Sequence, residues 1–145
     1  MKVTENKYFL WEDAWVFTAL FSTTPDKSKI DLFNIISSGD ILNHSIVSKN
    51  EIINALIKLQ IRDIIFIKNR IVYYTENGKS IIANCNKIKG GMFSRVDITL
   101  KRLNSKRIKL PFISKYNKLL FITDTCYLNS YNKYIKIMDS IIISK

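Results

Sequence analysis

The side chains best suited to chemistry in this sequence are cations and amides, which bind phosphates and base edges. Lys and Arg number 23 against 12 Asp and Glu, for a formal net charge of +11. Such a balance normally indicates a polyanionic partner, most often nucleic acid. The charge is uneven, because residues 1–75 carry a net +1 and residues 76–145 a net +10. Lysine outnumbers arginine 18 to 5, so a coding bias toward lysine is the alternative explanation for part of the excess.

Residues suited to catalysis or to metal binding are few. His44 lies beside Asp40 and Asn43, where we expect it to satisfy backbone groups of a turn. Cys85 and Cys126 lie among apolar neighbours, and we expect both thiols to be buried. A single histidine leaves no set of ligands for zinc, and no Gly-rich phosphate loop or nucleophile motif occurs. We therefore expect no enzymatic activity, no metal and no cofactor.

Hydrophobic runs are too short to span a membrane, because none approaches the roughly 20 apolar residues that a bilayer requires. The first residues also lack the apolar stretch of a signal peptide. We expect a cytoplasmic protein with no membrane partner.

Helical spacing of apolar residues dominates the first part of the chain and predicts a helix over 11–21. Ser28, followed by Asp31, predicts the start of a second helix. Gly39 is placed to end that helix, so that residues 40–47 form a turn or a short extra helical turn.

The clearest helix start lies at residue 48. Ser48 and Glu51 match a capping box, and Val47 with Ile52 matches a hydrophobic staple. These signals predict a third helix over 48–59.

Two short β-branched and aromatic runs, 64–67 and 71–74, follow this helix and predict a hairpin. Asn69 lies in the turn between them, where it tolerates a left-handed conformation. Thr75 is expected to cap a further helix that ends before Gly90.

The remainder of the chain is also expected to be helical. Residues 93–103 have amphipathic spacing, and Thr123 or Asp124 can cap a last helix with spaced tyrosines. A basic connector that contains Pro111 separates these two helices.

This order of elements within residues 11–89 resembles a winged helix-turn-helix domain. More narrowly, four segments are similar to a family of small bacterial winged-helix proteins without assigned function: Asp13-Ala14-Trp15-Val16, Gly39-Asp40-Ile41-Leu42-Asn43-His44-Ser45-Ile46, Thr75-Glu76-Asn77-Gly78-Lys79 and the stretch 121–134. We expect a mainly α fold with a small β-hairpin. It would comprise a winged-helix domain over 8–89 and a C-terminal helical extension over 90–145, which packs on that domain or on a partner subunit.

The resemblance implies where DNA would bind. In DNA-binding winged-helix proteins the third helix lies in the major groove and the wing contacts the backbone or the minor groove. By position, 48–59 is the recognition helix, with its asparagines able to pair with adenine edges, and 68–70 is the wing tip. The residues expected to contact DNA are Lys49, Asn50, Asn54, Lys58, Lys68, Asn69 and Arg70. The function implied is a transcriptional regulator that binds double-stranded DNA, with a homodimer formed through the C-terminal helices.

Two alternatives stay open. A protein-interaction or assembly module could keep the winged-helix core without reading DNA, since the recognition half carries little net charge. A secondary basic patch could instead track single-stranded nucleic acid or RNA, and its residues are Arg95, Arg102, Lys106, Arg107 and Lys109.

Overall fold

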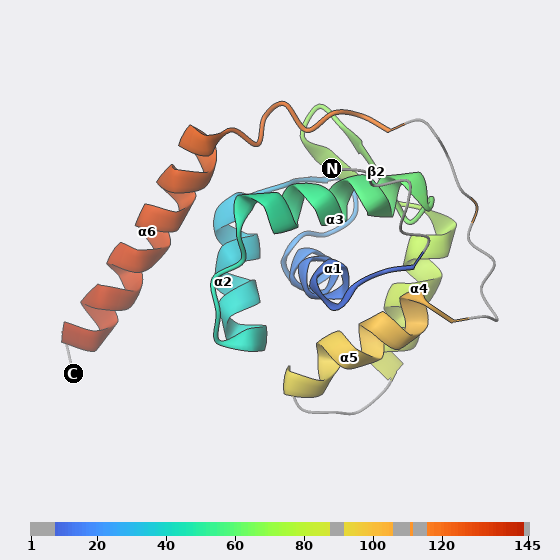
Figure 1. Ribbon diagram of the computed structural model, residues 1–145, viewed down its shortest axis with the longest axis horizontal. Helices are drawn as coiled ribbons and strands as arrows, with labels where there is room; N and C mark the ends of the chain where they lie inside the picture. Colours follow the sequence, from blue (N-terminus) through green and yellow to red (C-terminus); the bar gives the residue numbers. More distant parts are fainter. Residues whose placement is uncertain (1–7, 88–91, 106–110, 112–115, 144–145) are drawn as a thin grey trace.

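A computed structural model of the chain describes residues 8–87, 92–105, 111 and 116–143. These residues form helices and one small antiparallel sheet, which confirms the expectation of a mainly helical fold (Figure 1). The helices are α1 (Trp11–Thr23), α2 (Leu32–Asn43), α3 (Lys49–Ile61), α4 (Glu76–Lys87), α5 (Met92–Leu103) and α6 (Asp124–Ile143). The strands are β1 (Ser28–Lys29), β2 (Ile65–Lys68) and β3 (Ile71–Tyr74), in the order β1-β3-β2.

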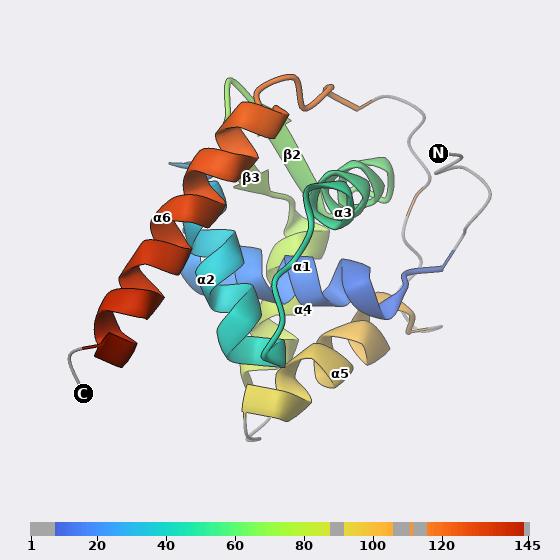
Figure 2. The ribbon, with the colours of Figure 1, turned by 60° about the vertical axis from the view of Figure 1, so that its left-hand side comes forward.

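Helix α1 is the centre of the core. It packs against α2, α3 and α5, which surround it in Figure 2. Every residue from Asp13 to Leu20 is buried, so no side of this stretch faces solvent. Apart from Asp13 and Thr18 this stretch is apolar, and a helix that is apolar on nearly all sides lies inside a protein.

The second helix begins later than the sequence predicts. Ser28 does not cap it, because Ser28 and Lys29 form β1 and pair with β3. The cap is Asp31, whose Oδ1 accepts a hydrogen bond from the Phe33 amide at 2.9 Å. The prediction for Ser28 was wrong because its backbone pairs with β3, a strand distant in sequence. Local residue types do not reveal such a pairing.

Gly39 was predicted to end the second helix, and this was also wrong. Helix α2 continues to Asn43, and His44 ends it with a φ of 53°. Gly39 instead lies inside α2, where its carbonyl accepts a hydrogen bond from the Trp15 indole Nε1 at 2.9 Å.

Helix α3 and the hairpin agree with the sequence prediction. The capping box forms, with the Glu51 amide donating to Ser48 Oγ at 3.1 Å and the Ser48 amide donating to Glu51 Oε1 at 2.9 Å. The hairpin turn consists of Asn69 and Arg70, with φ of 53° and 66°. Two consecutive left-handed residues are the geometry of a type I′ turn, whose twist suits a tight hairpin.

Helix α4 begins at the predicted cap. Thr75 Oγ1 accepts from the Gly78 amide at 3.1 Å, and the Thr75 hydroxyl lies within hydrogen-bond distance of the carbonyls of Asp63 and Ile64. Gly78 packs directly on the chain before β2, because a Cβ there would lie 2.1 Å from the Ile64 carbonyl oxygen. The absence of a side chain at Gly78 therefore sets how closely α4 approaches the sheet.

The C-terminal helices join the same core. On α5, Val96 and Leu103 are buried in the hydrophobic cluster that α1 organises. Helix α6 packs along α2, where Tyr134 Oη donates to Asp40 Oδ2 at 2.6 Å. Burial, together with this bond to the carboxylate, raises the pKa of Tyr134 to about 12. The expected domain boundary between residues 89 and 90 lies outside the described residues.

Cys85 is buried as expected, whereas Cys126 is exposed in the first turn of α6. The prediction for Cys126 was wrong: the neighbouring Tyr127 of the same turn contacts the chain before α3, whereas Cys126 lies at an exposed position. Within the described part of the chain, no helix combines the length and apolar character that crossing a membrane requires.

Replacement of Gly78 tests the close approach of α4. We expect Gly78→Ala to lower the free energy of unfolding by about 3 kcal/mol, because the new methyl group cannot fit against a backbone carbonyl. Urea denaturation measures the change. Ser80→Ala, at an exposed position on the same helix, is the control and should stay within about 0.5 kcal/mol of the unsubstituted chain. A Gly78→Ala variant as stable as the unsubstituted chain would contradict this packing.

Candidate nucleic-acid interface

The two asparagines expected to read bases lie on the outward side of α3. Asn50 is exposed and Asn54 is half-buried, one helical turn further on. Neither side chain bonds to another residue in the described part of the structure. Both amides are therefore open to a partner, as their proposed role requires.

Lys49 begins the same helix, but its charge is already paired. Its Nζ lies 2.5 Å from Asp124 Oδ1 at the start of α6. The same turn of α6 also contacts the residue before α3, since Tyr127 Oη donates to the Val47 carbonyl at 2.7 Å. Helix α6 thus borders the N-terminal end of α3, a placement that the sequence did not predict.

Lys58 lies inside the protein, so the expectation that it faces outward toward phosphates is wrong. Its Nζ lies 2.6 Å from Asp13 Oδ2, and these side chains are only 8% and 6% exposed. The ammonium also donates to the Tyr8 carbonyl at 3.2 Å. Helical spacing placed Lys58 opposite the buried stripe, but the chain before α1 covers that side of α3.

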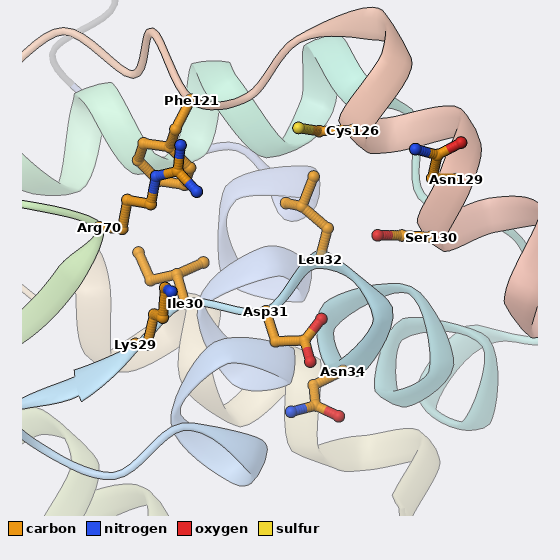
Figure 3. A pocket seen from close by; sticks show the side chains of 10 residues that line it. All are labelled: Lys29, Ile30, Asp31, Leu32, Asn34, Arg70, Phe121, Cys126, Asn129 and Ser130. Atoms are coloured by element: carbon orange, nitrogen blue, oxygen red, sulfur yellow. The ribbon is translucent and has the colours of Figure 1, made fainter.

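The turn of the hairpin presents exposed polar residues, as predicted. Lys68, Asn69 and Arg70 are all exposed. The Arg70 guanidinium lies over the Phe121 ring, 5.7 Å from its centroid, and Figure 3 shows the two side chains together. Stacking on an aromatic ring orients a guanidinium while leaving its N–H groups free to donate.

Two further cations gather at this turn, and residue types and spacing predicted neither of them. Lys29 on β1 and Lys68 on β2 each pair with Ile71 of the central strand, so their side chains share one face of the sheet. Lys118, from the segment before α6, borders the same hollow as Lys68 and Arg70. We call Lys29, Lys68, Arg70 and Lys118 the hairpin cation cluster.

The side chains of this cluster form no ion pair with any residue that the structure describes. Local patterns assigned Lys29 to a helix and Lys118 to a connector, so neither was linked to the hairpin. The signal available for Lys29 was its place in the short polar run that follows Pro25, where an exposed lysine is expected.

The outward face of the sheet also carries two aromatic rings. Phe66 and Tyr73 pair across the hairpin with ring centroids 5.7 Å apart. Alternation along β2 places Phe66 on the same face as Lys68, and Phe66 is 46% exposed. In contact with a nucleic acid, the rings can lie against sugars while the neighbouring cations pair with phosphates.

The secondary basic patch does not join this face in the described residues. Arg95 and Arg102 lie on α5, which packs on the opposite side of α1 from α3 and the hairpin in Figures 1 and 2. Arg95 donates to the Asn86 side chain at 2.9 Å. Lys106, Arg107 and Lys109 lie outside the described residues.

The described residues contain no group of three or more His, Cys, Asp or Glu side chains placed to hold a metal ion. Comparisons of the chain with protein-family models, with curated proteins and with solved structures returned no match.

Substitution of Lys58 tests its role as a buried partner of Asp13. We expect Lys58→Met to lower the free energy of unfolding by about 3–5 kcal/mol, because it leaves an unpaired buried carboxylate. Combining it with Asp13→Asn should recover at least about 1 kcal/mol, since the amide oxygen still accepts from the Leu10 amide. Urea denaturation of both variants measures these differences.

The control is Lys49→Ala, which breaks an ion pair with an exposed carboxylate and should cost less than about 1 kcal/mol. Equal losses of stability for Lys58→Met and Lys49→Ala would show that the buried Lys58–Asp13 pair matters no more to folding than the Lys49–Asp124 pair does.

Proposed function

We propose that this chain is a winged-helix protein that binds double-stranded DNA without chemical catalysis and acts as a regulator of transcription. The order helix, strand, two helices and hairpin over residues 11–74 supports the winged-helix assignment. Strand β1 adds to this support, because it pairs the segment between α1 and α2 with the turn end of β3 in the hairpin.

The hairpin cation cluster is the observation that carries the proposal. It brings Lys29, Lys68, Arg70 and Lys118 together from three segments of the chain, with Asp31 as the acidic residue beside them. Each phosphate that a cation neutralises releases counterions, which makes binding favourable at low salt. A cluster with unpaired charges can form such contacts without first breaking ion pairs of its own.

In the proposed complex, two elements make different contacts with DNA. Phosphate contacts come from the hairpin, because Lys49 is paired and Lys58 is buried on α3. Base contacts come from Asn50 and Asn54, whose amides are open on the outward side of α3. An asparagine amide can donate to and accept from the major-groove edge of adenine.

Titration of a short mixed-sequence duplex at several salt concentrations tests this function. We expect binding at low salt that weakens steeply as salt rises. The double variant Lys68→Ala/Lys118→Ala should bind several-fold more weakly, and the slope of log K against log salt should be shallower by about 0.9 for each phosphate that the variant no longer neutralises. Fluorescence anisotropy of a labelled duplex provides the measurement.

Arg70→Gly is a second variant, which removes a cation of the cluster with little expected effect on stability. Glycine adopts the left-handed turn without the strain that arginine bears, so the free energy of unfolding should fall by less than about 1 kcal/mol. Duplex binding should nevertheless weaken. Lys136→Ala, which removes an exposed cation on α6, is the matched control and should bind as the unsubstituted chain does. Absence of binding at low salt, or equal effects at Lys136 and at the cluster, would refute the proposal.

A second function, as a protein-interaction module, is favoured by the exposed apolar side chains of α6. Leu128, Ile137 and Ile142 are 52%, 41% and 67% exposed, whereas Val96 and Leu103 of α5 are buried within their own chain. Of the two C-terminal helices expected to mediate a homodimer, α6 thus has the exposed apolar surface. Figure 2 shows the end of α6 extending past α2.

Self-association through α6 has its own test. If α6 mediates a dimer, Ile137→Lys/Ile142→Lys should weaken it at least tenfold in sedimentation experiments, because two charges would enter an apolar contact. Asn132→Lys, at an exposed polar position of the same helix, should have a much smaller effect. A chain that sediments as a monomer at every concentration would exclude this mode.

A further inference from the structure

A pocket of about 560 Å³, largely open to solvent, lies beside Arg70, between the start of α2, the hairpin turn and the first turns of α6. We call it the α2–α6 cavity, and Figure 3 shows the side chains that line it. Its volume is in the range of small-molecule sites in proteins.

The charged groups of the cavity favour a ligand with a single negative charge. Arg70 and Lys29 line it, and neither side chain forms an ion pair with a described residue. Among the described residues that line the cavity, Asp31 is the one carboxylate, and its Oδ1 already accepts a hydrogen bond from the Phe33 amide as the cap of α2. Two cations against one carboxylate leave an excess of one positive charge, which a monoanion would balance.

The form of Arg70 favours a carboxylate. Its guanidinium is held over the Phe121 ring, so its planar fork of N–H donors is oriented before a ligand arrives. Such a fork matches the two oxygens of a carboxylate in a bidentate pair.

The remaining lining suits an apolar body with a polar end. Ile30 and Leu32 are nearly buried and supply apolar surface, and the Phe121 ring adds an aromatic wall. Figure 3 places Asn129 and Ser130 of α6 away from Arg70, with Leu32 between them. An amide and a hydroxyl at that position can hydrogen-bond to a polar substituent.

We propose that the α2–α6 cavity binds a small organic monocarboxylic acid with an aliphatic or aromatic body. The carboxylate pairs with Arg70 and Lys29, and the body lies on Leu32 and Phe121. No bond is made or broken in this step, so the site is one of binding alone.

This ligand would also act as a regulator, an extension that rests on the proposed DNA binding. Arg70 belongs both to the hairpin cation cluster and to the cavity. A carboxylate that engages Arg70 withdraws it from phosphate, so acid and duplex bind with negative coupling. By linkage, each weakens the other by the same factor.

Benzoate is the probe for the site, added to the isotope-labelled full chain and followed by amide NMR. We expect saturable shifts at the amides of Leu32, Arg70 and Asn129. Ser130→Phe should abolish these shifts by filling the cavity from α6, and Asn132→Phe, an added phenyl ring at an exposed position outside the lining, should leave them intact.

Three results would overturn the assignment of a carboxylate site. They are shifts that Ser130→Phe leaves unchanged, equal affinity for benzyl alcohol, and tighter binding of inorganic phosphate at the same amides. Arg70→Gln should weaken benzoate at least tenfold, because a neutral amide cannot replace the charged fork.

A separate measurement tests the regulation. Saturating benzoate should weaken duplex binding several-fold in the unsubstituted chain and leave it unchanged in Ser130→Phe, whose hairpin is intact. An unchanged duplex affinity in the unsubstituted chain would overturn the coupling. If the duplex itself did not bind, the proposed function would fail, whereas the NMR titration would still decide whether the cavity takes a carboxylate.

Discussion

The buried ion pair between Lys58 and Asp13 joins the two helices on which the rest of the structure depends. Asp13 also accepts from the Leu10 amide at the start of α1, and Lys58 also donates to the Tyr8 carbonyl. The pair therefore connects α1, α3 and the chain before α1 at a single point. Two charges removed from water require close mutual contact, because either one alone would be very costly to bury. This requirement restricts how α3 lies across α1, and the hairpin follows directly from the end of α3.

The position of the hairpin brings together charges that are distant in sequence. Strand β1 holds Lys29 beside the turn, and the segment before α6 brings Lys118 to the other side of it. The first 75 residues are nearly neutral in sum. Among those that the structure describes, Lys29, Lys68 and Arg70 meet at this turn without ion pairs, whereas both lysines of α3 are held in ion pairs. The distribution of unpaired charge thus says more than the net charge of +11 about where a polyanion would bind.

Helix α6 gives the molecule a second organising element. Its first turn reaches Lys49 and Val47 at the start of α3, and its later residues pack on α2 through Tyr134. The same turns border the cavity that Arg70 enters from the hairpin. The proposed base-reading helix and the proposed ligand site therefore both contact α6, and the ligand site shares Arg70 with the proposed phosphate contacts.

The sequence by itself determined the features that depend on neighbouring residues. The capping box of Ser48, the turn at Asn69 and the caps at Thr75 and Thr123 all follow from hydrogen bonds within a few residues, so residue type and spacing suffice to predict them. Tertiary structure decided the rest: that Ser28 joins a strand, that Gly39 lies within a helix against Trp15, and that Lys58 turns inward to Asp13. The same is true of the hairpin cation cluster, whose members come from three segments. The physical reason is that the partners in these contacts are distant in the chain, and only the packing of the core determines which segments meet.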